Sequence, residues 1–263
     1  RHVRDLLGGR IFADMRVGQE EGALGGDDEG HRREVADVGG QADDVLDMPQ
    51  ARGEAALEAG DHRVSLAARD GPIATLIAET GGANAMIVDS TALPEQVARD
   101  AVASAFQSAG QRCSALRLLC VQEDVADTMI EMVAGAMAEL NVGDPSILAT
   151  DVGPIIDAEA RANIAAYVAE ARATGRVIAE AGRTNLPADG HFVPPVAIRL
   201  DHVTDLKREI FGPVLHVATW KGGELDQLID AINASGYGLT LGVHTRIDGV
   251  AAHIAARAQV GNV

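Results

Sequence analysis

Residues 110–121 have the sequence GQRCSALRLLCV, and the rest of the chain can be interpreted outward from this stretch. Its polar beginning predicts a turn after the end of a helix, and its apolar remainder at 116–121 predicts a buried strand. A cysteine in a turn can expose its thiol, whereas a cysteine in a buried strand packs as a small hydrophobic residue. The pattern therefore predicts a core position for Cys120 and leaves two roles open for Cys113, a packed side chain or a reactive thiol.

From about Ser65 onward, short apolar runs alternate with Ala-rich amphipathic stretches. Pro94 suits the first turn of a helix, and that helix is expected to run toward Gly110, because glycine suits a helix end. Alternating strands and helices predict an α/β fold with a largely parallel sheet covered by helices on both faces. The expected strands are 74–79, 85–88, 116–121, a strand near Val177, 193–200, 213–219 and 239–244, and the other expected helices are 123–140, 157–173, 224–234 and 249–258.

Residues 1–62 differ in composition from everything after them. They hold 15 Asp or Glu and 7 Arg, but no Ser, Thr, Asn, Lys, Cys, Trp or Tyr. With four exceptions, each residue can be encoded by a codon that begins with G or C. The exceptions are Ile11, Phe12, Met15 and Met48. Two explanations stay open, namely GC-rich DNA read in a wrong frame or strand, and a disordered, acidic, low-complexity arm. Residues 1–64 therefore receive no domain assignment.

The composition is that of a folded protein without a disulfide framework. Of the 263 residues, 47% are hydrophobic and two are cysteines, and no apolar run approaches the length of a membrane span. The formal net charge of −17 disfavours nucleic acid and anionic membranes as partners, because both would be repelled. The eight histidines lack the spacing of a metal site, so no metal ligand is predicted. Without a secretory pattern at its beginning, the chain is expected in the cytoplasm.

Three short motifs carry side chains suited to cysteine catalysis, which needs a thiolate, a base and donors for an oxyanion. The first is the Cys113 turn, where the cysteine's own backbone N–H can face the attacked atom. The second is Glu79, followed after one residue by two glycines that let the backbone bend and let another group approach closely. The third is EIFGP at 209–213, which places a carboxylate and an aromatic ring before a tight turn. Taken singly, each motif more often has an ordinary structural role in a turn or on the surface than a catalytic one.

The order and spacing of the motifs carry more weight than any one of them. Glu79 lies 34 residues before Cys113, and Glu209 lies 96 residues after it. With this spacing, the sequence resembles the aldehyde dehydrogenase superfamily from about residue 65 to the end of the chain. Within it, the sequence is similar to the L-glutamate γ-semialdehyde (1-pyrroline-5-carboxylate) dehydrogenase modules of bacterial bifunctional proline-utilisation proteins. The motifs that carry the resemblance are ETGGANAMIVDS at 79–90, GQRCSA at 110–115 and KREIFGPV at 207–214.

The resemblance implies NAD-dependent oxidation of L-glutamate γ-semialdehyde to L-glutamate, a step of proline degradation. It implies that Cys113 attacks the aldehyde to give a thiohemiacetal. Glu79 would be the general base that activates water to hydrolyse the thioester formed next. The resemblance also implies that Glu209 accepts hydrogen bonds from the nicotinamide ribose and that Phe211 flanks this part of the cofactor. For Phe211, a packing role stays open as an alternative.

The resemblance further implies a remnant of a Rossmann-like cofactor-binding domain at 65–81 and the aldehyde dehydrogenase catalytic domain at 82–263, truncated at its C-terminus. Two features that family members carry upstream, a glycine-bearing pyrophosphate turn and an oxyanion-hole asparagine, cannot be located in residues 1–62. The expected partners are a small aldehyde substrate and either a second copy of the chain or a proline dehydrogenase module. Two alternatives to the full reaction stay open: a fragment limited to cysteine-dependent ester or thioester hydrolysis, and a non-catalytic docking partner.

Overall fold

A computed structural model of the chain describes residue 68, residues 81–181 and residues 186–263. Glu79, the strand expected at 74–79 and the acidic segment at 1–62 lie outside the described residues. The described residues include nearly all of the part expected to be the catalytic domain.

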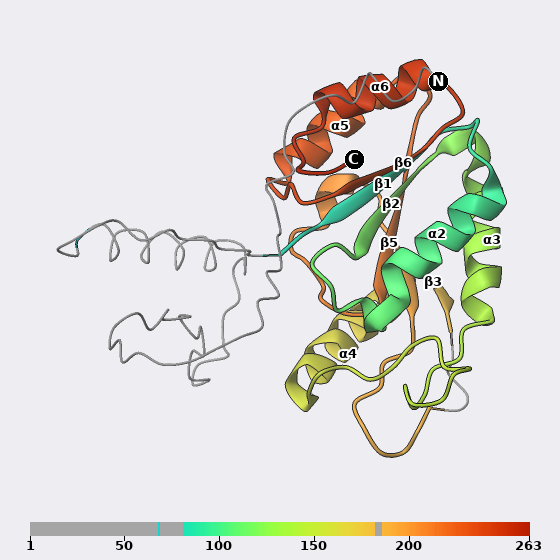
Figure 1. The fold of residues 1–263 in the computed structure, drawn as a ribbon, viewed down its shortest axis with the longest axis vertical. Helices are drawn as coiled ribbons and strands as arrows, with labels where there is room; N and C mark the ends of the chain where they lie inside the picture. The colour runs from blue at the N-terminus through green and yellow to red at the C-terminus, as the bar shows by residue number, and fades with distance from the viewer. Residues whose placement is uncertain (1–67, 69–80, 182–185) are drawn as a thin grey trace, which may run out of the picture. The chain divides into compact units, whose positions relative to one another are not determined.

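Within the described residues, six strands form one sheet in the order β3-β4-β5-β2-β1-β6 (Figure 1). Neighbouring strands run parallel, except that β3 pairs antiparallel with β4 at one edge. The strands are β1 (Asn84–Val88), β2 (Leu116–Gln122), β3 (Val177–Glu180), β4 (Val196–Arg199), β5 (Val214–Trp220) and β6 (Leu241–His244). The predicted largely parallel α/β sheet is confirmed, with β4 and β6 shorter than expected.

The helices follow the predicted pattern, although several of their ends differ by one to four residues. They are α2 (Pro94–Phe106), α3 (Ala126–Ala138), α4 (Ala158–Ala173), α5 (Leu225–Ala234) and α6 (Asp248–Arg257), with short 3₁₀ turns η1 (Gln107–Gly110), η2 (Glu123–Val125) and η3 (Val203–Asp205). The helix expected to run toward Gly110 ends at Phe106, because the residues after it leave the α-helical conformation. The helix expected at 123–140 begins as the η2 turn. In the described part of the chain, no helix is long and apolar enough to cross a membrane.

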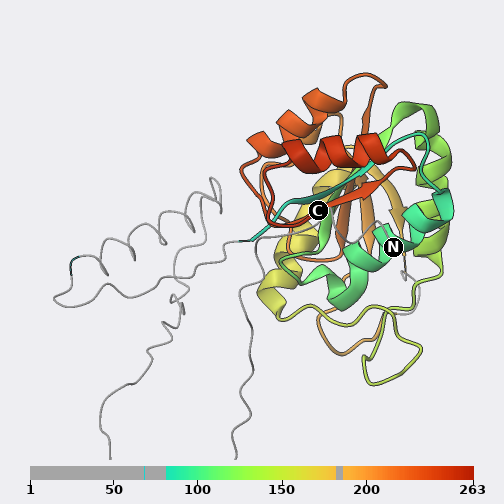
Figure 2. The same cartoon turned by 45° about the horizontal axis from the view of Figure 1, so that its top comes forward.

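Helices cover both faces of the sheet, as predicted (Figures 1 and 2). Side chains alternate along β1, so Met86 and Val88 join the core packed by α2, α3 and α4, whereas Ala85 and Ile87 join the core packed by α5 and α6. Cys120 of β2 is fully buried in the second core. Burial raises the pKa of the Cys120 thiol to about 12, so the predicted core position of this cysteine is confirmed.

The parallel direction of the strands brings the segments that precede β1, β2 and β5 to one edge of the sheet. In register, Asn84 at the start of β1 lies opposite Leu116 at the start of β2. We call this end of the sheet, where the parallel strands begin, the amino edge. It carries two glycines before β1, the Cys113 turn before β2 and residues 209–212 before β5. Motifs far apart in the sequence therefore meet in the fold.

Candidate active site

The Cys113 turn begins with left-handed backbone after the end of α2. Ser108, Ala109 and Gly110 have φ angles of 57°, 54° and 66°. A non-glycine residue adopts this conformation at a cost of roughly 1 kcal/mol or more, and such strain is concentrated at functional sites. The run ends the helix and redirects the chain, and Cys113 lies half-buried in the turn that follows. The predicted position of Cys113, just past a helix end, is confirmed.

Gly110 is required by a close approach as well as by its φ angle. A Cβ atom at this position would clash with the carbonyl of Gly212, in the loop before β5. Gln111 fixes the other side of the turn, because its amide donates to Pro154 O at 3.1 Å and accepts from Ile156 N at 2.8 Å. The turn is thus held against two segments that are distant in the sequence.

The amide of Asn84 holds the backbone of Cys113 from the neighbouring strand. Asn84 is 5% exposed, and its Nδ2 donates to Cys113 O at 2.7 Å and to Ala115 O at 2.9 Å. Its Oδ1 accepts from Thr240 N at 3.1 Å. A buried amide is stable when its donors and acceptor are paired in this way. The peptide that follows the Cys113 Cα is therefore fixed by a side chain of β1.

Glu209 lies at the amino edge beside the two glycines that follow Glu79 in the sequence. Its Oε2 atom accepts a hydrogen bond from Gly82 N at 3.0 Å. Gly81 has a φ angle of 102°, and a Cβ atom there would clash with the same carboxylate oxygen. The prediction that these glycines allow a close approach is confirmed: Glu209 approaches Gly81, and the backbone carbonyl of Cys113 approaches Gly82. Glu79 lies outside the described residues, so its role stays a prediction.

The side chain that joins the motifs is Arg117, the second residue of β2, which is fully buried. Its guanidinium donates to Glu209 Oε1 from Nε at 3.2 Å and from Nη2 at 3.1 Å, and to Gly212 O from Nη1 at 2.9 Å. Nη2 also donates to Gly110 O at 2.6 Å and to Arg112 O at 3.3 Å. One side chain thereby connects the turn before β2 with the loop before β5.

The charges of Arg117 and Glu209 compensate each other in a largely buried setting. Burial lowers the pKa of Arg117, and the charge and hydrogen bond of Glu209 act in the opposite direction. Arginine stays protonated in proteins, so the contact is an ion pair. The ring centroid of Phe211 lies 5.4 Å from Arg117 Cζ, and Phe211 is 47% exposed. Phe211 therefore packs on the ion pair and also offers surface to a ligand.

Comparison with known proteins identifies the family of the chain. The model of the aldehyde dehydrogenase family matches residues 57–263. The chain belongs to the aldehyde dehydrogenase family. The α/β fold with a largely parallel sheet agrees with that membership.

Several relatives of the chain are named for proline utilization or for 1-pyrroline-5-carboxylate. The bifunctional protein PutA of Klebsiella aerogenes is 58% identical over 193 residues, which are 72% of this chain and 15% of that protein. The 1-pyrroline-5-carboxylate dehydrogenase of Geobacillus kaustophilus (strain HTA426) is 38% identical over 173 residues, which are 65% of this chain and 33% of that enzyme. A solved structure of proline utilization A with proline bound in remote sites has a TM-score of 0.73 at 55% identity, and the match covers 78% of this chain and 21% of that one. The chain thus spans only a minor part of these relatives.

Behind the ion pair of this aldehyde dehydrogenase, Tyr167 and His216 extend the buried hydrogen-bonded network. His216 Nδ1 donates to Arg117 O at 2.9 Å, so the neutral ring accepts at Nε2 from the Tyr167 hydroxyl, also at 2.9 Å. Burial lowers the pKa of His216 to about 4; the charges of Arg117 and Arg176 act in the same direction, and the hydrogen bond to Arg117 O acts against them. His216 is therefore neutral near pH 7 and supports the strand that carries Arg117.

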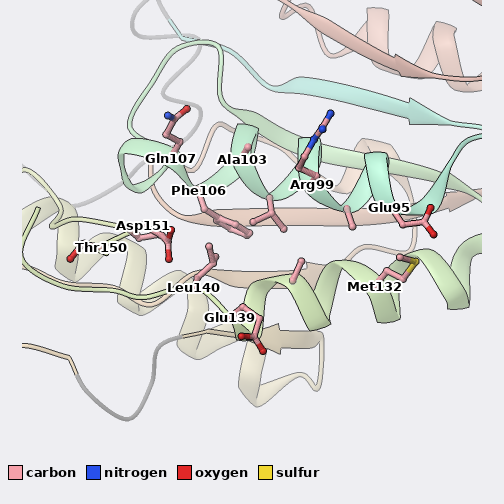
Figure 3. A pocket seen from close by; sticks show the side chains of 14 residues that line it. Glu95, Arg99, Ala103, Phe106, Gln107, Met132, Glu139, Leu140, Thr150 and Asp151 are labelled. Carbon is pink, nitrogen blue, oxygen red and sulfur yellow. The ribbon is translucent and has the colours of Figure 1, made fainter. Parts of the chain in front are cut away.

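A groove with a volume of about 730 Å³ lies between α2 and α3 (Figure 3). In Figure 3, the side chains of Phe106 and Leu140 lie across this groove from each other. Its lining includes no residue of the Cys113 turn or of 209–212, so we assign it no part in the chemistry. A smaller cavity of about 170 Å³ adjoins the turn and is lined in part by Asn84 and Ser114.

Three residues that hold the aldehyde dehydrogenase site together were not singled out in the sequence. Arg117 carried a usable signal, because a lone charge in an apolar strand needs a buried partner. Asn84 and Gln111 lay inside recognisable motifs, but nothing local indicated their contacts. Their partners come from Thr240, just before β6, and from the segment before α4, which only the tertiary fold brings near.

Replacement of Gly110 by alanine is expected to destabilise the protein more than the same replacement at Gly175. Their φ angles are 66° and 69°, so both changes incur a backbone penalty of roughly 1–2 kcal/mol. Only the Cβ at Gly110 would meet a fixed group, the Gly212 carbonyl, and such overpacking adds about 1–3 kcal/mol. Urea unfolding of the two variants measures the difference. Equal losses of unfolding free energy would contradict the packing described for this turn.

The pKa of His216 predicts how stability changes with pH relative to a His216→Gln variant. Between pH 6.5 and about 4, the unfolded chain binds a proton at His216 and the folded chain does not. Protonation therefore favours unfolding, and about 3 kcal/mol of stability that is present above pH 6.5 is lost as the pH falls to about 4. Chemical unfolding of both proteins across this range isolates the effect, since their carboxylates titrate alike. Parallel curves would show that His216 is not buried as a neutral ring.

Proposed function

We propose that this member of the aldehyde dehydrogenase family oxidises L-glutamate γ-semialdehyde to L-glutamate, with NAD as the hydride acceptor. The observation that carries the proposal is the meeting of the Cys113 turn, the two glycines and Glu209 at the amino edge. The substrate is supported by the names of the relatives, PutA and 1-pyrroline-5-carboxylate dehydrogenase. Pyrroline-5-carboxylate, which the second name contains, is the cyclic imine formed from glutamate γ-semialdehyde, and PutA is named for proline utilization.

In this proposal, Cys113 is the nucleophile. Its thiolate sulfur forms a bond to the aldehyde carbon, and the carbonyl oxygen becomes an oxyanion in a thiohemiacetal. The backbone N–H of Cys113 donates to that oxygen. This role is supported by the half-buried position of the residue and by the hydrogen bond of 2.7 Å from Asn84 to its carbonyl, which limits how far the backbone can move.

The second half of the reaction returns the thiol. When bound, NAD accepts the hydride that leaves the thiohemiacetal carbon, and a thioester remains on Cys113. We assign Glu79 the role of general base, which takes a proton from the water that attacks this thioester. The carbon–sulfur bond then breaks, and glutamate leaves. This assignment is supported by the sequence, in which Glu79 lies two residues before Gly81.

Glu209 and Phe211 are the residues that we assign to the cofactor. Glu209 Oε2 accepts one hydrogen bond within the described residues, from Gly82 N, and a carboxylate oxygen can accept a second from a ribose hydroxyl. Phe211 offers a partly exposed aromatic face next to this carboxylate's partner, Arg117. The acceptor oxygen of Glu209 and the exposed ring face of Phe211 therefore fit a nicotinamide ribose.

We further propose that the protein works beside either a second copy of itself or a proline dehydrogenase module. Support for the second partner comes from the relatives, which are bifunctional proteins named for proline utilisation. The matched segment is 15% of PutA, which leaves ample sequence in that relative for another module.

Replacement of Cys113 by alanine is expected to abolish NADH formation from NAD and L-glutamate γ-semialdehyde, by at least about 1,000-fold, because it removes the nucleophile. The absorbance of NADH measures the reaction. Cys120→Ala is the matched control, since this buried thiol lies in the core and should retain most of the activity.

The pattern of results separates the proposal from its alternatives. NADH formation that survives in Cys113→Ala would refute the assignment of the nucleophile. If Cys113 is required for hydrolysis of p-nitrophenyl acetate but no NADH forms, the proposed function changes from dehydrogenation to ester hydrolysis. If the unmodified chain does neither, it acts at most as a docking partner.

A further inference from the structure

The position of Arg117 has a consequence for the nucleophile itself. The Nη2 atom of Arg117 lies 3.3 Å from Arg112 O, and this carbonyl belongs to the peptide whose N–H is that of Cys113. The next peptide, whose carbonyl is Cys113 O, is held by Asn84 at 2.7 Å. Both peptides that flank the Cys113 Cα are therefore fixed by buried side chains from two neighbouring strands.

The same guanidinium also fixes the other side of the site. Nε and Nη2 both donate to Glu209 Oε1, and Nη1 donates to Gly212 O. Because Glu209 Oε2 accepts from Gly82 N, the backbone before β1 is included in the same network. The nucleophile turn and the carboxylate assigned to the cofactor thus share one cation.

We infer that Arg117 is a positioning residue that holds the Arg112–Cys113 peptide and the Glu209 carboxylate in one fixed arrangement. The inference deepens the proposed function and rests on it for the roles of Cys113 and Glu209. A cationic donor on Arg112 O polarises the peptide and strengthens the Cys113 N–H as a donor to negative charge. Arg117 thereby acts through this N–H rather than by touching the substrate.

Arginine suits this task better than lysine for a geometric reason. The acceptors lie on different sides of a planar group, and all three guanidinium nitrogens donate to at least one of them. A lysine ammonium has its donors on a single nitrogen and cannot span acceptors arranged in this way. Arg117→Lys therefore preserves the charge while losing the simultaneous hold on the turn and on the carboxylate.

The test measures the reactivity of the Cys113 thiol with iodoacetamide, which requires neither NAD nor aldehyde. The rate at Cys113 is followed by peptide mass spectrometry as a function of pH. In Arg117→Lys, we expect alkylation near pH 7 to be slower by about tenfold and the pH profile to move upward, because the thiolate loses a fixed N–H donor. Among the described residues, the charged side chains of this network are Arg112, Arg117 and Glu209, and Arg117→Lys leaves two of them unaltered and keeps the positive charge of the third.

Two comparisons separate positioning from a general loss of stability. Ile254→Ala removes a buried side chain of α6, in the core packed by α5 and α6. This variant should leave the pH profile of Cys113 alkylation unchanged even though its thermal unfolding midpoint falls. Cys120 reports on unfolding, since its buried thiol should stay unreactive in every folded variant. If Arg117→Lys does not fold, the double variant Arg117→Met/Glu209→Gln replaces it, because it removes the cation together with its partner charge. The deciding comparison is then the alkylation rate of this double variant against that of Glu209→Gln alone.

A slowed and shifted profile in the Arg117 variants, with the Ile254→Ala profile unchanged, supports the inference. Alkylation at the unmodified rate and pH in the Arg117 variants would overturn it, as would an equal slowing in Ile254→Ala. The proposed function fails separately: if the chain makes no NADH but the thiol profile shifts as expected, the positioning role stands without the dehydrogenase reaction. If the chain makes NADH but the thiol profile does not shift, the dehydrogenase reaction stands and the positioning role of Arg117 is refuted.

Discussion

The interaction on which the site depends is the ion pair between Arg117 and Glu209. A charge buried within a sheet is tolerated only when it is paired and its remaining donors are satisfied. Arg117 meets that condition through the carboxylate and through the carbonyls of Gly110, Arg112 and Gly212. Removing one partner of such a pair typically costs about 3–5 kcal/mol, because the other charge is left uncompensated. The fold and the site geometry are therefore coupled through one side chain.

This coupling explains why the site forms at the amino edge of the sheet. In many parallel α/β sheets, ligands bind beyond the carboxyl ends of the strands. Here the buried cation lies near the beginning of β2, so its acceptors must come from the segments that enter β1, β2 and β5. Close approach of these segments excludes side chains at several points, which is why glycines occur at Gly81, Gly82 and Gly110.

Much of the architecture was predictable from local patterns. Apolar runs located the strands, Pro94 and Asp157 marked helix starts, and the alternation of elements indicated a parallel sheet. The end of α2 was less predictable: Gly110 suited a helix end, but the left-handed conformations of Ser108 and Ala109 move that end back to Phe106. Such strain is imposed by tertiary contacts and leaves no signature in the residues themselves.

The residue types of the site were predictable from the sequence, but the hydrogen bonds that join its segments were not. The spacing of the motifs indicated that Cys113 and Glu209 belong together, and the structure brings their segments to one edge. What joins them is a contact between β2 and residues 92 positions further along the chain, which no local pattern encodes. The roles of Glu79 and of residues 1–62 stay predictions, because these residues lie outside the described part of the structure.

The central claim is that a buried guanidinium, each of whose nitrogens donates a hydrogen bond, joins the two halves of the site, and hydrogen exchange of arginine side chains tests it most directly. In protein labelled with ¹⁵N-arginine, we predict one Nε–H resonance that exchanges with solvent at least about 100-fold more slowly than those of exposed arginines. This resonance should vanish in Arg117→Lys and persist in Arg199→Lys, a change at an exposed position. If every arginine Nε–H exchanges at the rate of an exposed side chain, Arg117 is not held in this network and the claim is wrong.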